Sequence, residues 1–127
     1  MISINADCEN FVRIEGHVDR IKSYVSEKGK KELSFLLYSV NSNEDDLFIT
    51  TVKVVCRNKS AEIVKDFLQT NMCVKVEGIL RIQKGGRVEI ISTFVRPSAP
   101  HWIDVEDDRF TKSKEVEKVW EDFTKGA

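Results

Sequence analysis

The sequence predicts an all-β fold, a small five-stranded Greek-key barrel with one short helix between its third and fourth strands. Three observations lead to this prediction. Apolar and polar residues alternate along several short segments, as they do in half-buried strands. Residues 60–69 instead repeat their apolar positions at helical spacing. Polar turns and a glycine pair separate the segments where hairpins would lie.

The composition fits one folded domain. The chain has 127 residues, of which 41% are apolar and 32% charged, so it has enough apolar surface for one core. No apolar run approaches the ~20 residues of a membrane span. Residues 1–7 lack the basic-then-apolar order of a secretory signal. We therefore expect a soluble, cytoplasmic protein with no membrane partner.

The cysteines and histidines form no recognisable chemical site. Cys8, Cys56 and Cys73 make an odd count without the short spacing of a zinc site or a disulfide framework. Cys56 and Cys73 lie in apolar stretches, where we expect reduced, buried thiols. His17 and His101 stand apart from any nucleophile or carboxylate pattern. These patterns indicate a protein without a metal or cofactor that is not an enzyme.

The first strand follows a loose leader of residues 1–9. It begins at Asn10, and its pattern allows a bent continuation to Tyr24. The positions that alternate on one face are Val12, Ile14, Gly16 and Val18. Gly16 in mid-strand indicates a bulge or a close backbone approach, as a curling sheet requires.

Two more strands follow, each preceded by a polar turn. The turn at residues 27–32 centres on Gly29 and precedes a second strand over residues 33–40, which is apolar at nearly every position. An acidic turn at 41–46 precedes a third strand over 47–57, which is rich in β-branched residues.

The helix and the last two strands complete the pattern. Ser60 is a good N-cap residue for the helix of residues 60–69, and Asn71 is a plausible C-terminal cap. The Gly85-Gly86 pair predicts a tight hairpin between the last two strands. These strands cover residues 74–82 and 87–96.

Three strands, a helix and two further strands make the element order of the oligonucleotide-binding (OB) barrel. A generic α+β sheet with the same order is the alternative. We expect the OB domain to span residues 10–96 and residues 97–127 to form a C-terminal extension.

Three motifs resemble the bacterial single-stranded DNA-binding protein (SSB) family. They are Asn10-Phe-Val-Arg-Ile-Glu-Gly16, Val52-Lys-Val-Val-Cys-Arg57 with the helix start after it, and Val74-Lys-Val-Glu-Gly78-Ile-Leu80. They resemble the family's first strand, its third strand and its fourth strand in that order. The resemblance implies an OB fold, single-stranded DNA as ligand, and a homodimer or homotetramer that pairs through the first strands.

The chain also departs from this family. At positions where the family places DNA-stacking Trp or Phe, it has Thr51, Arg57, Gly85 and Asn43. The hairpin between the last two strands is cut to Lys84-Gly-Gly-Arg87, and the family's acidic tail with a terminal Phe is absent. In the compact hairpin and the missing tryptophans the chain is more similar to the dimeric primosomal replication protein of the same superfamily.

An OB barrel binds oligonucleotides with the exposed faces of its second and third strands and the hairpins beside them. Alternation in the third strand places Thr51, Lys53, Val55 and Arg57 outward and Val52, Val54 and Cys56 inward. We expect Lys53 and Arg57 to contact phosphates, and the Arg57 guanidinium to stack on a base. A solvated basic face is the alternative.

Further cations and rings lie near this surface. The other predicted nucleic-acid-binding residues are Lys28, Lys30, Lys31, Tyr38, Phe48, Arg81, Lys84 and Arg87. The rings of Tyr38 and Phe48, and equally that of Tyr24, are placed to meet a base. Phe35 and Phe67 instead fit the core pattern. Ordinary hairpins and packed rings are the alternative interpretation.

The C-terminal extension carries a different signal. Ser113 begins a predicted helix of residues 113–124 with an apolar stripe formed by Val116, Val119, Trp120 and Phe123. A helix this short is marginal alone in water, so the stripe needs a partner surface. Its own barrel or a sister subunit is the first interpretation, a replication or repair partner the second, and a disordered tail the third.

The charge distribution is consistent with nucleic-acid binding. Residues 1–103 have a net charge of +2, and residues 104–127 have −3. The favoured hypothesis is a protein that holds single-stranded DNA in replication, repair or recombination. The alternatives are a protein-interaction OB module that binds nucleic acid weakly or not at all, and an RNA-binding barrel.

Overall fold

The structure is a computed structural model that describes residues 2–42 and 45–99 of the chain. Its elements in order are β1 (Val12–Val25), β2 (Lys31–Ser42), β3 (Leu47–Arg57), α1 (Lys59–Lys65), β4 (Cys73–Ile82) and β5 (Val88–Pro97). This is the predicted order. The predicted helix of residues 113–124 with its stripe, His101 and Asn43 lie outside the described residues.

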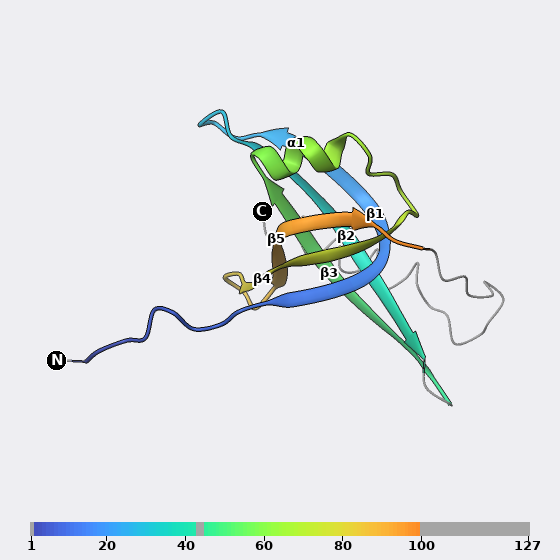
Figure 1. Cartoon of the computed structure of the whole chain (residues 1–127), viewed down its shortest axis with the longest axis horizontal. Helices are drawn as coiled ribbons and strands as arrows, with labels where there is room; N and C mark the ends of the chain where they lie inside the picture. Colours follow the sequence, from blue (N-terminus) through green and yellow to red (C-terminus); the bar gives the residue numbers. More distant parts are fainter. Residues whose placement is uncertain (1, 43–44, 100–127) are drawn as a thin grey trace.

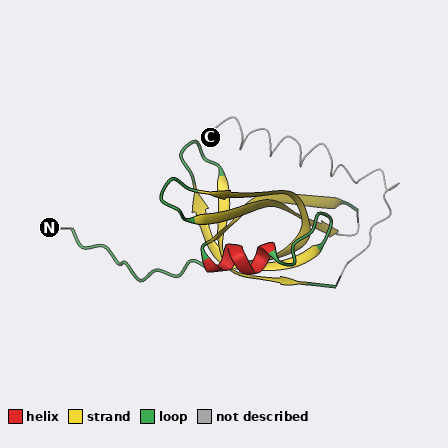
Figure 2. Ribbon diagram, turned by 90° about the horizontal axis from the view of Figure 1, so that it is seen from above, coloured by secondary structure: helices red, strands yellow, loops and turns green. Residues whose placement is uncertain are grey.

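The five strands close into a barrel in the order β1-β2-β3-β5-β4. Neighbouring strands are antiparallel except β3 and β5, which pair in parallel. Figure 2 shows the strands curling around a closed interior with α1 lying against it. The predicted five-stranded OB barrel is therefore confirmed, and the alternative of a generic α+β sheet is wrong.

The first strand, β1, is long because it pairs with two strands, one after the other. Residues 12–17 pair with β4, and residues 17–25 pair with β2. An irregularity between Asp19 and Lys22, where Arg20 has a φ of 55°, bends the strand between the two partners. Figure 1 shows this bend, and beyond it the β2–β3 hairpin extends away from the barrel. The expected continuation through Tyr24 is confirmed.

The backbones of β1 and β2 meet at Gly16. A Cβ atom on Gly16 would lie 2.4 Å from the main-chain oxygen of Tyr38, which is closer than atoms can approach. Gly78 is in the same position against β5, where a Cβ would lie 2.3 Å from the oxygen of Ile91. The sequence predicted either a bulge or a close backbone approach at Gly16, and the structure has the close approach.

The interior is one apolar cluster. Its buried residues are Val18, Leu33, Phe35, Leu37, Val52, Val54, Cys56, Ala61, Val64, Val74, Val76, Ile90 and Val95. Phe35 is fully buried and Phe67 packs partly buried against the cluster, as predicted. Cys56 and Cys73 are buried free thiols. Burial raises the pKa of the Cys56 thiol, which keeps it protonated and unreactive.

The helix is shorter than predicted and starts in a different way. Asn58, not Ser60, is its N-cap residue, and it makes no side-chain capping hydrogen bond. The Asn58 N–H instead donates to the oxygen of Lys31 at 2.8 Å, which ties the start of α1 to β2. Asn71 lies six residues beyond the helix end and donates its N–H to the oxygen of Val18 at 2.7 Å. It therefore anchors the loop to β1 rather than capping α1.

The predicted glycine hairpin between β4 and β5 is confirmed. Gly85 and Gly86 have φ values of 96° and 84°, which favour glycine. The Gln83 N–H donates to the oxygen of Arg87 at 2.7 Å and closes the turn. Near the same end of β4, the Asn10 side-chain amide donates to and accepts from the main chain of Leu80 at 2.8 and 3.0 Å.

We predict that Gly16→Ala destabilises the barrel by about 1–3 kcal/mol, because the new methyl group must push two paired backbones apart. Thermal unfolding followed by circular dichroism measures the effect. Gly29→Asn is the control, since Gly29 has open space around it and a φ of 76° that Asn tolerates. Equal melting temperatures for the two variants would contradict the role of Gly16.

Candidate nucleic-acid interface

The outer wall of β2 and β3 is the predicted interface. Val52, Val54 and Cys56 face the core, so the strand alternation is confirmed. The strand pairing aligns the outward residues in rows across the barrel wall. These rows are Asp19, Leu36, Lys53 and Glu89; Lys22, Ser34, Val55 and Ile91; and Tyr24, Glu32 and Arg57. A strand of nucleic acid on this wall would cross the three rows.

Lys53 lies beside a buried carboxylate. Glu89 is opposite Lys53 in the β3–β5 pair, and its side chain is fully buried. Glu89 forms an ion pair with Arg81 and accepts a hydrogen bond from Gln83 Nε2 at 2.8 Å. These contacts compensate a charge that would be costly to bury alone. Arg81, which we predicted to bind nucleic acid, thus forms an ion pair with Glu89, and 42% of its side chain stays exposed.

Arg57 is exposed at the end of β3. Its cross-strand neighbour is Glu32, which is paired in turn with Tyr24. Partial burial and the hydrogen bond to Glu32 raise the pKa of Tyr24 to about 12, while the charge of Arg57 acts in the opposite direction. A cation and a half-exposed ring therefore lie together here, as contacts to a phosphate and a base require.

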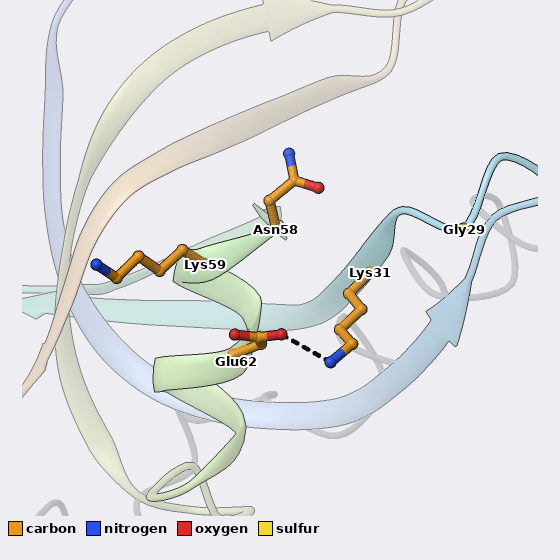
Figure 3. A pocket seen from close by; sticks show the side chains of 5 residues that line it. All are labelled: Gly29, Lys31, Asn58, Lys59 and Glu62. Carbon is orange, nitrogen blue, oxygen red and sulfur yellow. Dashed lines mark hydrogen bonds and ion pairs between the residues drawn. The ribbon is translucent and has the colours of Figure 1, made fainter.

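The first hairpin meets the start of α1 at an open pocket of about 370 Å³. Its lining residues are Gly29, Lys31, Asn58, Lys59 and Glu62. Figure 3 shows Lys31 pointing to Glu62, with Nζ 2.7 Å from Oε1. This contact lowers the pKa of the Glu62 carboxyl. The structure thus brings Lys31 close to the end of β3, and Lys28 and Lys30 are exposed in the same hairpin.

The two predicted rings differ from their expected placement. Tyr38 is 2% exposed, and its ring stacks on His17 with centroids 5.3 Å apart, so a base has no access to it in this conformation. Phe48 is half exposed, but it lies an odd number of residues before Lys53 in an unbroken ladder. Strand alternation therefore puts Phe48 on the opposite face from Lys53.

The β4–β5 turn carries the remaining predicted cations. Lys84 is exposed and Arg87 half-buried, two residues before the buried Glu89. Two cations were missed: Lys59, which lines the pocket, and Lys22, which is exposed in the row of Ser34 and Val55. Lys59 follows Arg57 by two residues, and this short basic run was the available signal.

Other kinds of site find little support in the part of the chain that the structure describes. Within residues 2–42 and 45–99, no group of three or more His, Cys, Asp or Glu side chains could hold a metal ion. In the same residues no helix has the length and apolar character needed to cross a membrane.

The closed barrel with its outward rows defines an OB-fold protein. The sequence matches no protein-family model and no curated protein. Solved structures do match. The second single-stranded DNA-binding protein of Mycobacterium smegmatis has a TM-score of 0.62 at 21% identity, over 76% of this chain and 99% of that one.

Two further solved structures share the fold. The small single-stranded DNA-binding protein of Streptomyces coelicolor has a TM-score of 0.64 at 16% identity, over 76% of this chain and 96% of that one. The PriB protein of Ralstonia solanacearum has a TM-score of 0.62 at 10% identity, over 72% of this chain and 100% of that one. At these identities the likeness establishes the fold.

We predict that alkaline pH weakens the fold through its tyrosines. Burial raises the pKa of Tyr38 from 10.0 to about 12, with Asp19 adding to the effect. The folded state thus favours the neutral ring. The resulting stability is complete below pH 10 and is lost as the pH rises towards 12. Urea unfolding across this range should show a smaller loss for Tyr38→Phe than for the wild type; identical losses would contradict the assignment.

Proposed function

We propose that the protein binds single-stranded DNA on the outer wall of its barrel, in replication, repair or recombination in the cytoplasm. The observation that carries this proposal is the gathering of cations where the first hairpin, the end of β3 and the start of α1 meet. The hairpin with Lys28 and Lys31 is far in sequence from Arg57, yet the hydrogen bond from the Asn58 N–H to the Lys31 oxygen brings the two segments together. The solved structures that share the fold, named as single-stranded DNA-binding proteins, support the same ligand.

The side chains of this surface differ in the contacts that they would make with DNA. Lys28, Lys30 and Lys59 offer mobile ammonium groups to phosphates, which gives affinity without reading sequence. Arg57 offers a flat guanidinium that stacks on a base. The Tyr24 ring lies in the same row, two strands away. We propose that Lys53 and, at the far side, Lys84 and Arg87 complete the phosphate track.

We also propose that the chain forms a homodimer or homotetramer. Phe11, just before β1, is 62% exposed, and Ile79 of β4 and Phe94 of β5 are 46% and 51% exposed. An ion pair between Arg13 and Glu77 links β1 to β4. Exposed apolar groups around a polar pair are typical of a protein interface. A single monomeric species in analytical ultracentrifugation would contradict the proposal.

One observation favours a second candidate function. The outer wall of β2 is apolar and its Tyr38 ring is buried, so the described wall offers a base few open rings. An accessory module that binds protein would have such a wall. The stripe Val116, Val119, Trp120 and Phe123 would be the second contact with a replication or repair partner. RNA as ligand is the third possibility, since a stacking groove accepts either sugar.

Fluorescence anisotropy of a labelled oligo-dT separates these functions. A strand of about 35 nucleotides covers more than one OB site of ~4–16 nucleotides. Binding should be clear at about 50 mM salt and much weaker at about 200 mM, because phosphate contacts release counterions. No binding at the lower salt would reject the proposal in favour of the protein-interaction module. Tighter binding of oligo-U would indicate RNA.

We predict that Lys53→Ala with Arg57→Ala weakens oligo-dT binding about 10-fold or more and reduces the salt slope by about 2, one for each phosphate that is no longer neutralised. The melting temperature should change little, because Arg57 is exposed and Lys53 is half-buried. Lys65→Ala with Arg96→Ala is the matched control, with the same charge change away from the wall. Equal affinity of the two double variants would show that the binding face is a different one.

A further inference from the structure

A buried carboxylate lies on the wall that would bind nucleic acid. The strand register places Lys53, Glu89 and Arg81 in one row across β3, β5 and β4. The side chain of Glu89 is 1% exposed, whereas that of Arg81 is 42% exposed. A negative charge repels phosphates, so a carboxylate in this row calls for a physical reason.

Both oxygens of this carboxylate accept hydrogen bonds. Arg81 Nη2 donates to Oε1 of Glu89, and Gln83 Nε2 donates to Oε2 at 2.8 Å. The carboxylate is thus held at two points, and it restrains the guanidinium of Arg81 in turn. An arginine side chain without such a partner would sample many rotamers in water.

Stability does not explain this network. Replacing a buried ion pair by apolar residues of similar volume is often neutral or stabilising, because the desolvation of the charges offsets their attraction. Leu36 in the same row and Ile91 on the same face of β5 are apolar. An apolar residue at position 89 would therefore fit its surroundings. The effect of the carboxylate on Arg81 is the better explanation.

The pair of Arg81 and Glu89 has no net charge, so it adds little attraction for a phosphate. The guanidinium is also a flat, weakly hydrated group, and such a group stacks on a base. A guanidinium that is already oriented loses less entropy when a base binds. The wall has few other groups for this contact, since Tyr38 is buried and Phe48 lies on the opposite face.

We propose that Glu89 is a positioning residue that holds the Arg81 guanidinium as a stacking platform for a base. The platform extends the nucleic-acid face from β3 over β5 to β4, and Lys53 in the same row contacts a neighbouring phosphate. The platform role rests on the proposed function. It gives Arg81 a contact that depends little on salt, unlike the contacts of the lysines.

Removing the whole pair tests the platform without changing the net charge. Arg81→Met with Glu89→Met leaves no unpaired buried charge, so the barrel should melt at the wild-type temperature or above. Its affinity for the labelled oligo-dT should fall about 10-fold at both salt concentrations, with an unchanged salt slope, because a stacked base is lost and no phosphate contact is. An abasic strand of the same length has phosphates without bases, and the variant should bind it like the wild type.

Glu89→Gln tests the positioning role while Arg81 stays in place. The neutral amide leaves Arg81 as a free cation that is no longer held. The salt slope should therefore increase by about 1, while the affinity at about 200 mM salt falls below that of the wild type. A Glu89 that only neutralised Arg81 would give tighter binding at both salt concentrations. That result, or no change at all, overturns the proposal.

Two further variants complete the comparison. Arg81→Lys keeps the charge pair but has no flat group, so it should lose nearly as much affinity for oligo-dT as the double variant. It also tests the platform if the double variant fails to fold. Lys65→Met with Asp66→Met is the matched control, because it removes one charge of each sign from exposed positions at the end of α1. It should bind both strands like the wild type.

The outcomes separate the platform from the proposed function. Wild-type affinity of either Arg81 variant for oligo-dT, in a folded chain, rejects the platform alone. An equal loss on the abasic strand, or a salt slope that decreases by about 1 in the double variant, would show that Arg81 contacts a phosphate, and it also rejects the platform. If the wild type binds neither strand, the proposed function and the platform are both rejected.

Discussion

The barrel depends on the contact between the β1 and β2 backbones at Gly16. At this point β1 changes its partner from β4 to β2, and only a residue without a side chain lets the Tyr38 oxygen approach so closely. If the strands were held apart here, one sheet could not close on itself. The same condition recurs at Gly78, where β5 passes β4 beside its own irregularity. At both glycines the absence of a side chain lets neighbouring strands approach closely where the sheet closes into a barrel.

Closure has a direct consequence for function. A closed single-layer barrel has one inside, which the core residues and α1 fill, and one outside, which holds every residue available to a ligand. Because β3 lies between β2 and β5, the residues of three strands align in rows on that outside. Lys53 and Arg57 gain their neighbours, Glu89 and Glu32, from this alignment. The electrostatics of the wall are thus set by register, not by the local sequence.

This explains which features the sequence predicted. Element order, the inward and outward sides of β3 and the burial of Phe35 follow from local periodicity, and they were predicted correctly. The pairing of Arg81 with Glu89 needs the β4–β5 register, which periodicity does not provide. The start of α1 at Lys59 depends on a hydrogen bond between Asn58 and Lys31 across the chain. The capping propensity of serine alone had predicted Ser60 as the N-cap residue.

The rings of Tyr38 and Phe48, at the candidate site, also show what local periodicity cannot predict. Both are aromatic, lie near one hairpin and read alike in the sequence, yet one is buried on the outer wall and the other half exposed on the opposite face. The Tyr38 ring stacks on His17, its partner in the β1–β2 register, and the alternation within one strand does not predict a contact between strands. Because this wall offers few open rings, the proposed binding of DNA rests mainly on cations such as Lys53 and Arg57.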